Sequence, residues 1–90
     1  MNCTTEMLFE LPLAAVSPPP GSKNVRLGKI VTGPGGNWVP CATKVASGHF
    51  YPGLFQVGPG QRQVCMSDYK VSCSQAALNR AIKIAQSAAA

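Results

Sequence analysis

The last part of the chain carries apolar residues at the spacing of an α-helix. The stripe consists of Leu78, Ala81, Ile82, Ala85 and Ala89, widened by Ala77, Ile84 and Ala88. Polar and charged residues fall on the opposite side, so the pattern predicts one amphipathic helix from about Cys73 to Ala88. Ser72 and Gln75 stand three residues apart before the apolar run, which is the spacing of a capping box. We therefore expect Ser72 to cap the helix and Gln75 to reach back to the cap amide.

Upstream of this stretch, apolar and polar residues alternate in short runs that end at glycines and prolines. A period of two is typical of strands that pack on one face. The predicted strands are residues 25–32, 38–46, 54–57 and 62–71. Residues 47–53, which include Phe50 and Tyr51, are expected to form an aromatic-bearing loop. The pattern predicts an α+β fold, with a small antiparallel sheet of three to four strands packed against one C-terminal amphipathic helix.

The N-terminal part has a different character. Residues 7–13 can form a short extended strand, but Pro12 confines such a strand to the edge of a sheet. Residues 17–22 contain three consecutive prolines, which favour polyproline II and lack amide donors. The sequence therefore predicts an N-terminal arm and Pro-rich linker over residues 1–24, followed by a compact domain of sheet and helix over residues 25–90.

Charge is unevenly distributed along the chain. Eight Lys and Arg residues stand against three acids, a formal net charge of +5. Glu6 and Glu10 lie in the arm, so from residue 11 onward the eight basic residues face Asp68 alone and the formal charge is +7. A field of this sign attracts nucleic acid, anionic lipid or an acidic protein surface, and it also keeps a protein soluble. Composition leaves both interpretations open.

Neither a membrane span nor an export signal is predicted. No apolar run reaches the ~18 residues that mark a transmembrane helix. The apolar stretch at residues 7–16 is interrupted by Glu10 and Pro12, and it follows Glu6 where a secretory signal has basic residues. We therefore expect a cytoplasmic protein without a membrane partner, whose four cysteines are reduced thiols.

Candidate catalytic and metal-binding groups are few. His49 can be paired with Cys41 or Cys73 as base and nucleophile, but neither thiol lies in a sequence typical of a thiol enzyme. His49 and the thiols of Cys41, Cys65 and Cys73 also form a possible zinc ligand set. Seven residues separate Cys41 from His49 and Cys65 from Cys73, whereas structural zinc sites usually use about two to four. The glycine-rich segments join strands and do not open a helix, so they form no phosphate loop. We expect no enzymatic activity, no metal and no cofactor.

The order of elements resembles two classes of protein. A sheet followed by one helix over about residues 25–88 is similar in architecture to the arm-binding domains of tyrosine integrases. That resemblance implies a sheet that enters the major groove of DNA. The small size, the Ala-rich last helix and the lack of catalytic groups also resemble small phage-encoded inhibitors of the anti-CRISPR type. This second resemblance implies a compact α+β protein that binds a host protein or nucleoprotein complex.

We therefore predict a small non-catalytic binding protein whose partner is a protein or nucleoprotein complex, as for a phage-type inhibitor. The alternative is a nucleic-acid-binding module with a basic sheet face, on which aromatic rings stack on bases and cations neutralise phosphates. The predicted binding residues are Arg26, Lys29, Trp38, Lys44, Phe50, Tyr51, Arg62 and Lys70. Trp38 has a second interpretation as a core residue. Arg26 and Lys29 fall on opposite sides of an ideal strand, so the contact set is a subset of these residues.

Overall fold

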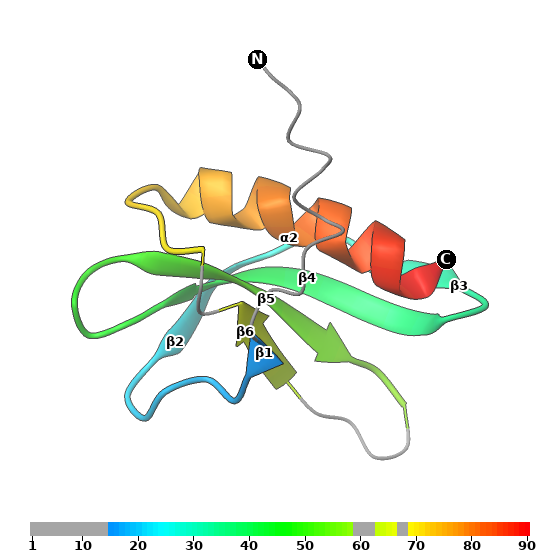
Figure 1. Cartoon of the computed structure of the whole chain (residues 1–90), viewed down its shortest axis with the longest axis horizontal. Helices are drawn as coiled ribbons and strands as arrows, with labels where there is room; N and C mark the ends of the chain where they lie inside the picture. The colour runs from blue at the N-terminus through cyan, green and yellow to red at the C-terminus, as the bar shows by residue number, and fades with distance from the viewer. Residues whose placement is uncertain (1–14, 59–62, 67–68) are drawn as a thin grey trace.

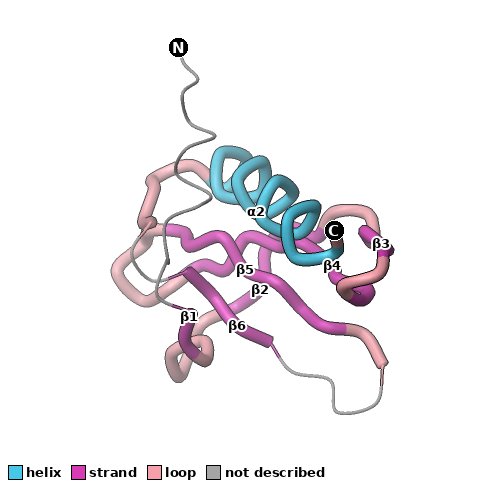
Figure 2. The backbone as a smooth tube through the Cα atoms, turned by 45° about the vertical axis from the view of Figure 1, so that its right-hand side comes forward, coloured by secondary structure: helices cyan, strands magenta, loops and turns pink. Residues whose placement is uncertain are grey.

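The molecule has two layers, in which one helix lies across one face of an antiparallel sheet (Figures 1 and 2). This computed structural model describes residues 15–58, 63–66 and 69–90. The strands are β1 (Ala15–Val16), β2 (Lys23–Leu27), β3 (Val31–Gly33), β4 (Gly36–Lys44), β5 (Phe50–Gln56) and β6 (Gln63–Met66), and the helix is α2 (Ser74–Ala89). The predicted α+β class is confirmed, with one C-terminal helix packed on an antiparallel sheet.

The sheet has more strands than the three to four expected. The sheet has six strands in the order β1-β6-β5-β4-β2. The remaining strand, β3, pairs with the first residues of β4, and β2 pairs with its last residues. The predicted aromatic loop at residues 47–53 is confirmed only for residues 47–49 and is wrong from Phe50 onward, where β5 begins. Pro52 and Gly53 suggested a turn, yet Pro52 tolerates this place in a strand. Phe50 exchanges two backbone hydrogen bonds with Val71, so its N–H and C=O point away from β4. The backbone of Pro52, two residues on, points the same way, and pairing with β6 begins only at Gly53. The N–H that proline lacks is therefore not needed in the sheet.

The predicted strand 25–32 is divided into β2 and β3. Both pair with β4, but the chain leaves the ladder between Leu27 and Val31. The Gly28 amide donates to the Pro40 carbonyl over 2.8 Å, so Pro40 faces this part of the edge. Because proline has no N–H, β4 cannot complete the ladder at this place. A Cβ on Gly28 would lie 2.9 Å from Cγ of Pro40, so the detour also needs a residue without a side chain.

Helix α2 follows its predicted bounds within one residue, but its N-terminal cap differs. Cys73 is the N-cap and makes no side-chain capping hydrogen bond, and Gln75 Nε2 donates to Asn79 Oδ1 instead of reaching back. The predicted capping box is therefore wrong. The apolar stripe packs as expected. Its buried members are Ala77, Leu78, Ala81, Ala85 and Ala89.

The two core clusters lie between α2 and the sheet. One joins Ala42 to Ala77 and Leu78, with Phe50, Val71 and Ile82 packed around them. The other joins Leu54, Met66 and Ala85, with Trp38 among the half-buried residues around them. Small alanines on the helix allow it to approach the strands closely, and dense packing of this kind supplies most of the stability of a short domain.

The end of α2 is fastened to the turn between β3 and β4. The Gly35 amide donates to the Ala89 carbonyl over 2.8 Å. A Cβ on Gly33 or Gly35 would overlap the last carbonyl groups of the helix, so the close approach requires glycine at both places. Glycines that join two strands therefore also hold the C-terminal end of the helix, whose last carbonyls lack partners within the helix.

Part of the predicted arm belongs to the sheet. Ala15 and Val16 pair with Met66 and Cys65 of β6, and β2 already begins at Lys23. The boundary predicted at residue 24 therefore does not coincide with a break in the sheet. The predicted edge strand at residues 7–13 lies outside the described residues.

Candidate functional site

Two of the three aromatic candidates, Trp38 and Phe50, lie on the helix side of the sheet. Trp38 is half-buried against the cluster around Leu54, and its Nε1 donates to the Gly35 carbonyl over 3.3 Å. Phe50 packs against the cluster around Leu78. The interpretation of Trp38 as a core residue therefore fits its position, and neither ring lies on the sheet face turned away from α2.

The described residues do not make the face turned away from α2 a basic surface. In register there, Cys41 and Cys65 stand on either side of Gly53, and Thr43 lies beside Cys41. Cys41, Thr43 and Cys65 have no exposed surface. The expected open, basic sheet face is therefore not found among the residues that the structure describes.

Basic side chains gather instead at the end of the sheet where α2 begins. Lys23 and Lys44 are direct cross-strand partners in β2 and β4, and both are exposed. They line a surface pocket of about 240 Å³ together with Gly21, Val45 and Ala46. The connection between β4 and β5 lies at the same end of the molecule as the start of α2 (Figure 1). We call Lys23, Arg26, Lys44 and Lys70 the basic end.

Arg26 joins this group through its place in the register. It pairs with Ala42, which packs on α2, so Arg26 points to the helix side of the sheet. Its Nε donates to Ser74 Oγ over 2.7 Å, in the first turn of the helix. That turn holds no acidic residue, so the positive end of the helix dipole adds to the same field.

The other predicted residues are dispersed. Lys70 is exposed and directly precedes Val71, which pairs with Phe50, so it lies at the same end of the sheet as Lys44. Lys29 is exposed in the bend between β2 and β3, and Tyr51 is half-buried opposite Thr43. Arg62 lies outside the described residues.

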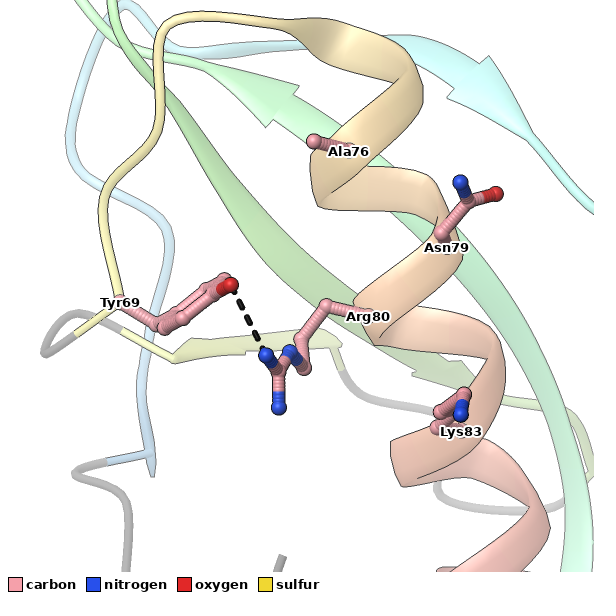
Figure 3. Close-up of a pocket in the computed structure, with 5 residues that line it drawn as sticks. All are labelled: Tyr69, Ala76, Asn79, Arg80 and Lys83. Carbon is pink, nitrogen blue, oxygen red and sulfur yellow. Dashed lines mark hydrogen bonds between the residues drawn. The ribbon is translucent and has the colours of Figure 1, made fainter. Parts of the chain in front are cut away.

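A second basic surface, which was not predicted from the sequence, combines an aromatic ring with helix residues (Figure 3). A pocket of about 200 Å³ is lined by Tyr69, Ala76, Asn79, Arg80 and Lys83. Arg80 Nη2 donates to the Tyr69 hydroxyl over 2.9 Å, and the guanidinium carbon lies 4.3 Å from the ring centroid. The four helix residues follow the spacing of one helix side, which the sequence shows, but the contribution of Tyr69 depends on tertiary structure.

The thiols lie in contrasting surroundings. Burial raises the pKa of Cys41, with a lowering contribution from Thr43 and a raising one from the nearby Cys65, and burial also raises the pKa of Cys65. Cys73 is exposed at the start of α2. Its pKa is lowered because the amides of Ala76 and then Gln75 favour the thiolate; desolvation opposes this shift, and the charge of Arg26 adds to it least.

These groups do not assemble into a catalytic or metal site within the described ranges. The His49 ring contacts Ser47, with Nδ1 and Oγ 3.1 Å apart. Cys65 and Cys73 are free thiols. No group of three or more His, Cys, Asp or Glu side chains is placed to hold a metal ion in the part of the chain that the structure describes.

Comparisons with protein-family models, with curated proteins and with solved structures found no match. Within residues 15–58, 63–66 and 69–90, no helix has the length and apolar character needed to cross a membrane.

Proposed function

We propose that this chain is a non-catalytic binding protein whose basic end holds an anionic region of a protein or nucleoprotein complex. The observation that carries this proposal is the Lys23–Lys44 pair. Like charges directly opposite each other on neighbouring strands destabilise a sheet, and these two stand beside the positive end of a helix. The residues that the structure describes include no acidic side chain to compensate them, since Glu6, Glu10 and Asp68 all lie outside the described ranges.

A surface with this charge fits an acidic protein region. Complementary charge accelerates association and selects the partner, while nearby apolar surface supplies affinity. The similarity in size and order of elements to phage-encoded inhibitors agrees with a protein target. We therefore propose that its biological role is that of an inhibitor or an adaptor of a host protein or nucleoprotein complex.

Direct nucleic-acid binding is the second candidate. The pocket around Tyr69 favours it, because an aromatic ring beside Arg80 and Lys83 offers stacking together with positive charge. This surface would replace the sheet face expected from the sequence, since Trp38 and Phe50 pack beneath the helix.

The test measures binding of fluorescent polyglutamate, a single-stranded oligonucleotide and a DNA duplex at low and moderate salt. Lys23→Gln with Lys44→Gln should weaken binding of the preferred probe about tenfold or more, because two close charges are removed. The control carries Gln86→Glu and Ser87→Glu, which lower the net charge equally at the far end of α2 and should have a much smaller effect.

The probes separate the two candidates. Preference for polyglutamate supports a protein target, whereas preference for an oligonucleotide with a steep loss of affinity in salt supports nucleic acid. Equal loss of binding in both variants would show that net charge alone acts, and that the basic end is not a binding surface.

A further inference from the structure

The outer edge of β2 combines exposed apolar side chains with positive charge. All five residues of β2 are exposed, and of the strands that the structure describes β2 is the last on its side of the sheet. Leu27 is 64% exposed, Ile30 49% and Val25 43%, which places three of the four exposed large hydrophobic residues of the described part along this edge. Lys23, Arg26 and Lys29 alternate with them in the sequence and are exposed as well.

The backbone of Leu27 points away from the sheet. Gly28 donates its amide to Pro40 of β4, so the backbone groups of Gly28 face inward. Successive residues of an extended chain direct their N–H and C=O groups to opposite sides, so those of Leu27 face outward. Leu27 also pairs in register with Cys41, which continues the strand up to this point. Among the described residues, this N–H and C=O have no backbone partner, and they lie on the outer edge beside the most exposed apolar side chain.

The charge on this edge selects its partner. An exposed strand edge invites another strand, and cations on the edge repel a second copy that carries the same cations. The repulsion becomes attraction when the incoming strand is acidic. The register shift between Asn24 and Arg26 interrupts regular pairing, so the usable part of the edge is centred on Leu27.

We propose that the outer edge of β2 accepts an extended acidic segment of a partner protein as an added strand, paired through the backbone of Leu27. The carboxylates of that segment would lie on the helix side of the sheet beside Arg26, and its apolar residues on the opposite side beside Leu27. This inference rests on the proposed function and names the partner as an acidic peptide segment. Strand addition of this kind takes affinity from main-chain hydrogen bonds and specificity from alternate side chains.

The experiment compares two substitutions at one position. Leu27→Ala removes the side chain, and Leu27→Pro removes the same side chain together with the outward N–H while leaving the inward ladder of β2 unchanged. The probe is a short synthetic peptide in which glutamate and valine alternate, and the control peptide has lysine in place of glutamate. Leu27→Pro should bind the acidic peptide about tenfold more weakly than Leu27→Ala, since one main-chain hydrogen bond is lost. The lysine peptide should not bind.

A second measurement uses the unaltered protein, so the test does not depend on the proline variant folding. Saturation with the acidic peptide should slow hydrogen exchange at the Leu27 amide. Equal affinity of the two variants and unchanged exchange at Leu27 would overturn the added strand, while loss of binding in the Lys23→Gln, Lys44→Gln protein would still support the basic end. Binding of the oligonucleotide but not the peptide, or pairing of the edge with a second copy in sedimentation, would also overturn it. Failure of every anionic probe would overturn both proposals.

Discussion

Gln63 Nε2 donates a hydrogen bond to Asn24 Oδ1 over 2.7 Å, although the two residues belong to strands that are not neighbours. Gln63 lies in β6 and Asn24 in β2, with β5 and β4 between them. In a flat sheet these strands would stand about 14 Å apart, at nearly 5 Å for each step. The sheet therefore curls enough for side chains of β6 and β2 to meet over the face away from α2, where Cys41, Thr43 and Cys65 are buried.

The junction between β6 and β2 should contribute measurably to stability. Asn24 Oδ1 also accepts from the hydroxyl of Thr43, which is fully buried. Asn24→Ala should lower the free energy of unfolding by about 1–3 kcal/mol, because a buried hydroxyl loses its acceptor. Urea denaturation of Asn24→Ala, Gln63→Ala and the double variant measures the coupling. Additive losses would show that the two side chains do not interact in solution.

Gly53 should tolerate no side chain. A Cβ at this position would lie 2.9 Å from Sγ of Cys41 and 3.0 Å from Oγ1 of Thr43. Gly53→Ala should therefore destabilise the protein by about 1–3 kcal/mol through overpacking. Adding Cys41→Ala should restore part of that loss by removing the sulfur. Thermal melts of the two single variants and the double variant test this, and a melting temperature unchanged by Gly53→Ala would contradict the packing described.

Leu78 should be the main anchor of α2. Its side chain is 9% exposed and packs against Ala42 of β4. Leu78→Ala should cost about 2–4 kcal/mol, the usual range for deleting a buried leucine. Gln86→Ala, at an exposed position of the same helix, should change stability by less than about 0.5 kcal/mol. Denaturant unfolding measures both, and a small loss for Leu78→Ala would mean that the apolar stripe does not pack on the sheet.

Cys73 should be the most reactive thiol among Cys41, Cys65 and Cys73. Its pKa is lowered, whereas burial raises the pKa values of Cys41 and Cys65. At neutral pH more of Cys73 is thiolate, so iodoacetamide should modify it first, and the rate should reach half its maximum below the ordinary thiol pKa. Arg26→Gln should move that midpoint to higher pH.

Peptide mapping by mass spectrometry follows the alkylation in a Cys3→Ser protein. A lowered pKa in the folded state stabilises the fold at high pH, and this contribution is lost as the pH falls through the pKa of Cys73. Cys41 and Cys65 act in the opposite direction, since the unfolded chain releases their protons first as the pH rises. Equal alkylation of all three thiols in the folded protein would contradict these surroundings.

Lys44→Glu should strengthen the fold and weaken binding. The change turns a like-charged pair with Lys23 into an opposite-charged pair, which should add about 0.2–1 kcal/mol to the free energy of unfolding. High salt should reduce the gain, because both side chains are exposed. Lys29→Glu, which lies outside the strands, serves as the control and should leave stability nearly unchanged. Denaturation and polyglutamate binding are measured together, and a loss of stability in Lys44→Glu would show that the two lysines do not repel.

The helix and the alternating strands could be predicted because their periodicity is local. The cap could not, since the backbone places Cys73 at the N-cap and Gln75 finds Asn79 four residues along the helix. The division of the 25–32 strand depends on Pro40, which stands in a different strand. The break in the strand follows from the tertiary structure, in which the Pro40 carbonyl accepts a hydrogen bond from Gly28.

The candidate site was less predictable because it depends on register. Alternation could separate Arg26 from Lys29, but the irregular pairing after Asn24 decides that Lys23 meets Lys44. Lys23 was therefore not among the predicted residues. Tyr69 and Arg80 are eleven residues apart, and only the packing of the helix brings ring and guanidinium together. Contact between the predicted residues and a partner stays a prediction.

Both ends of α2 are tied to the same margin of the sheet. Arg26 of β2 holds Ser74 at one end, and Gly35 beside β3 holds Ala89 at the other. The helix thus acts as a brace along the edge on which we place the acidic segment. A binding surface that is rigid beforehand loses little conformational entropy on association. The entropic cost of docking should therefore fall on the partner, so that a segment already held extended in its own protein would bind more tightly than the same segment as a free peptide.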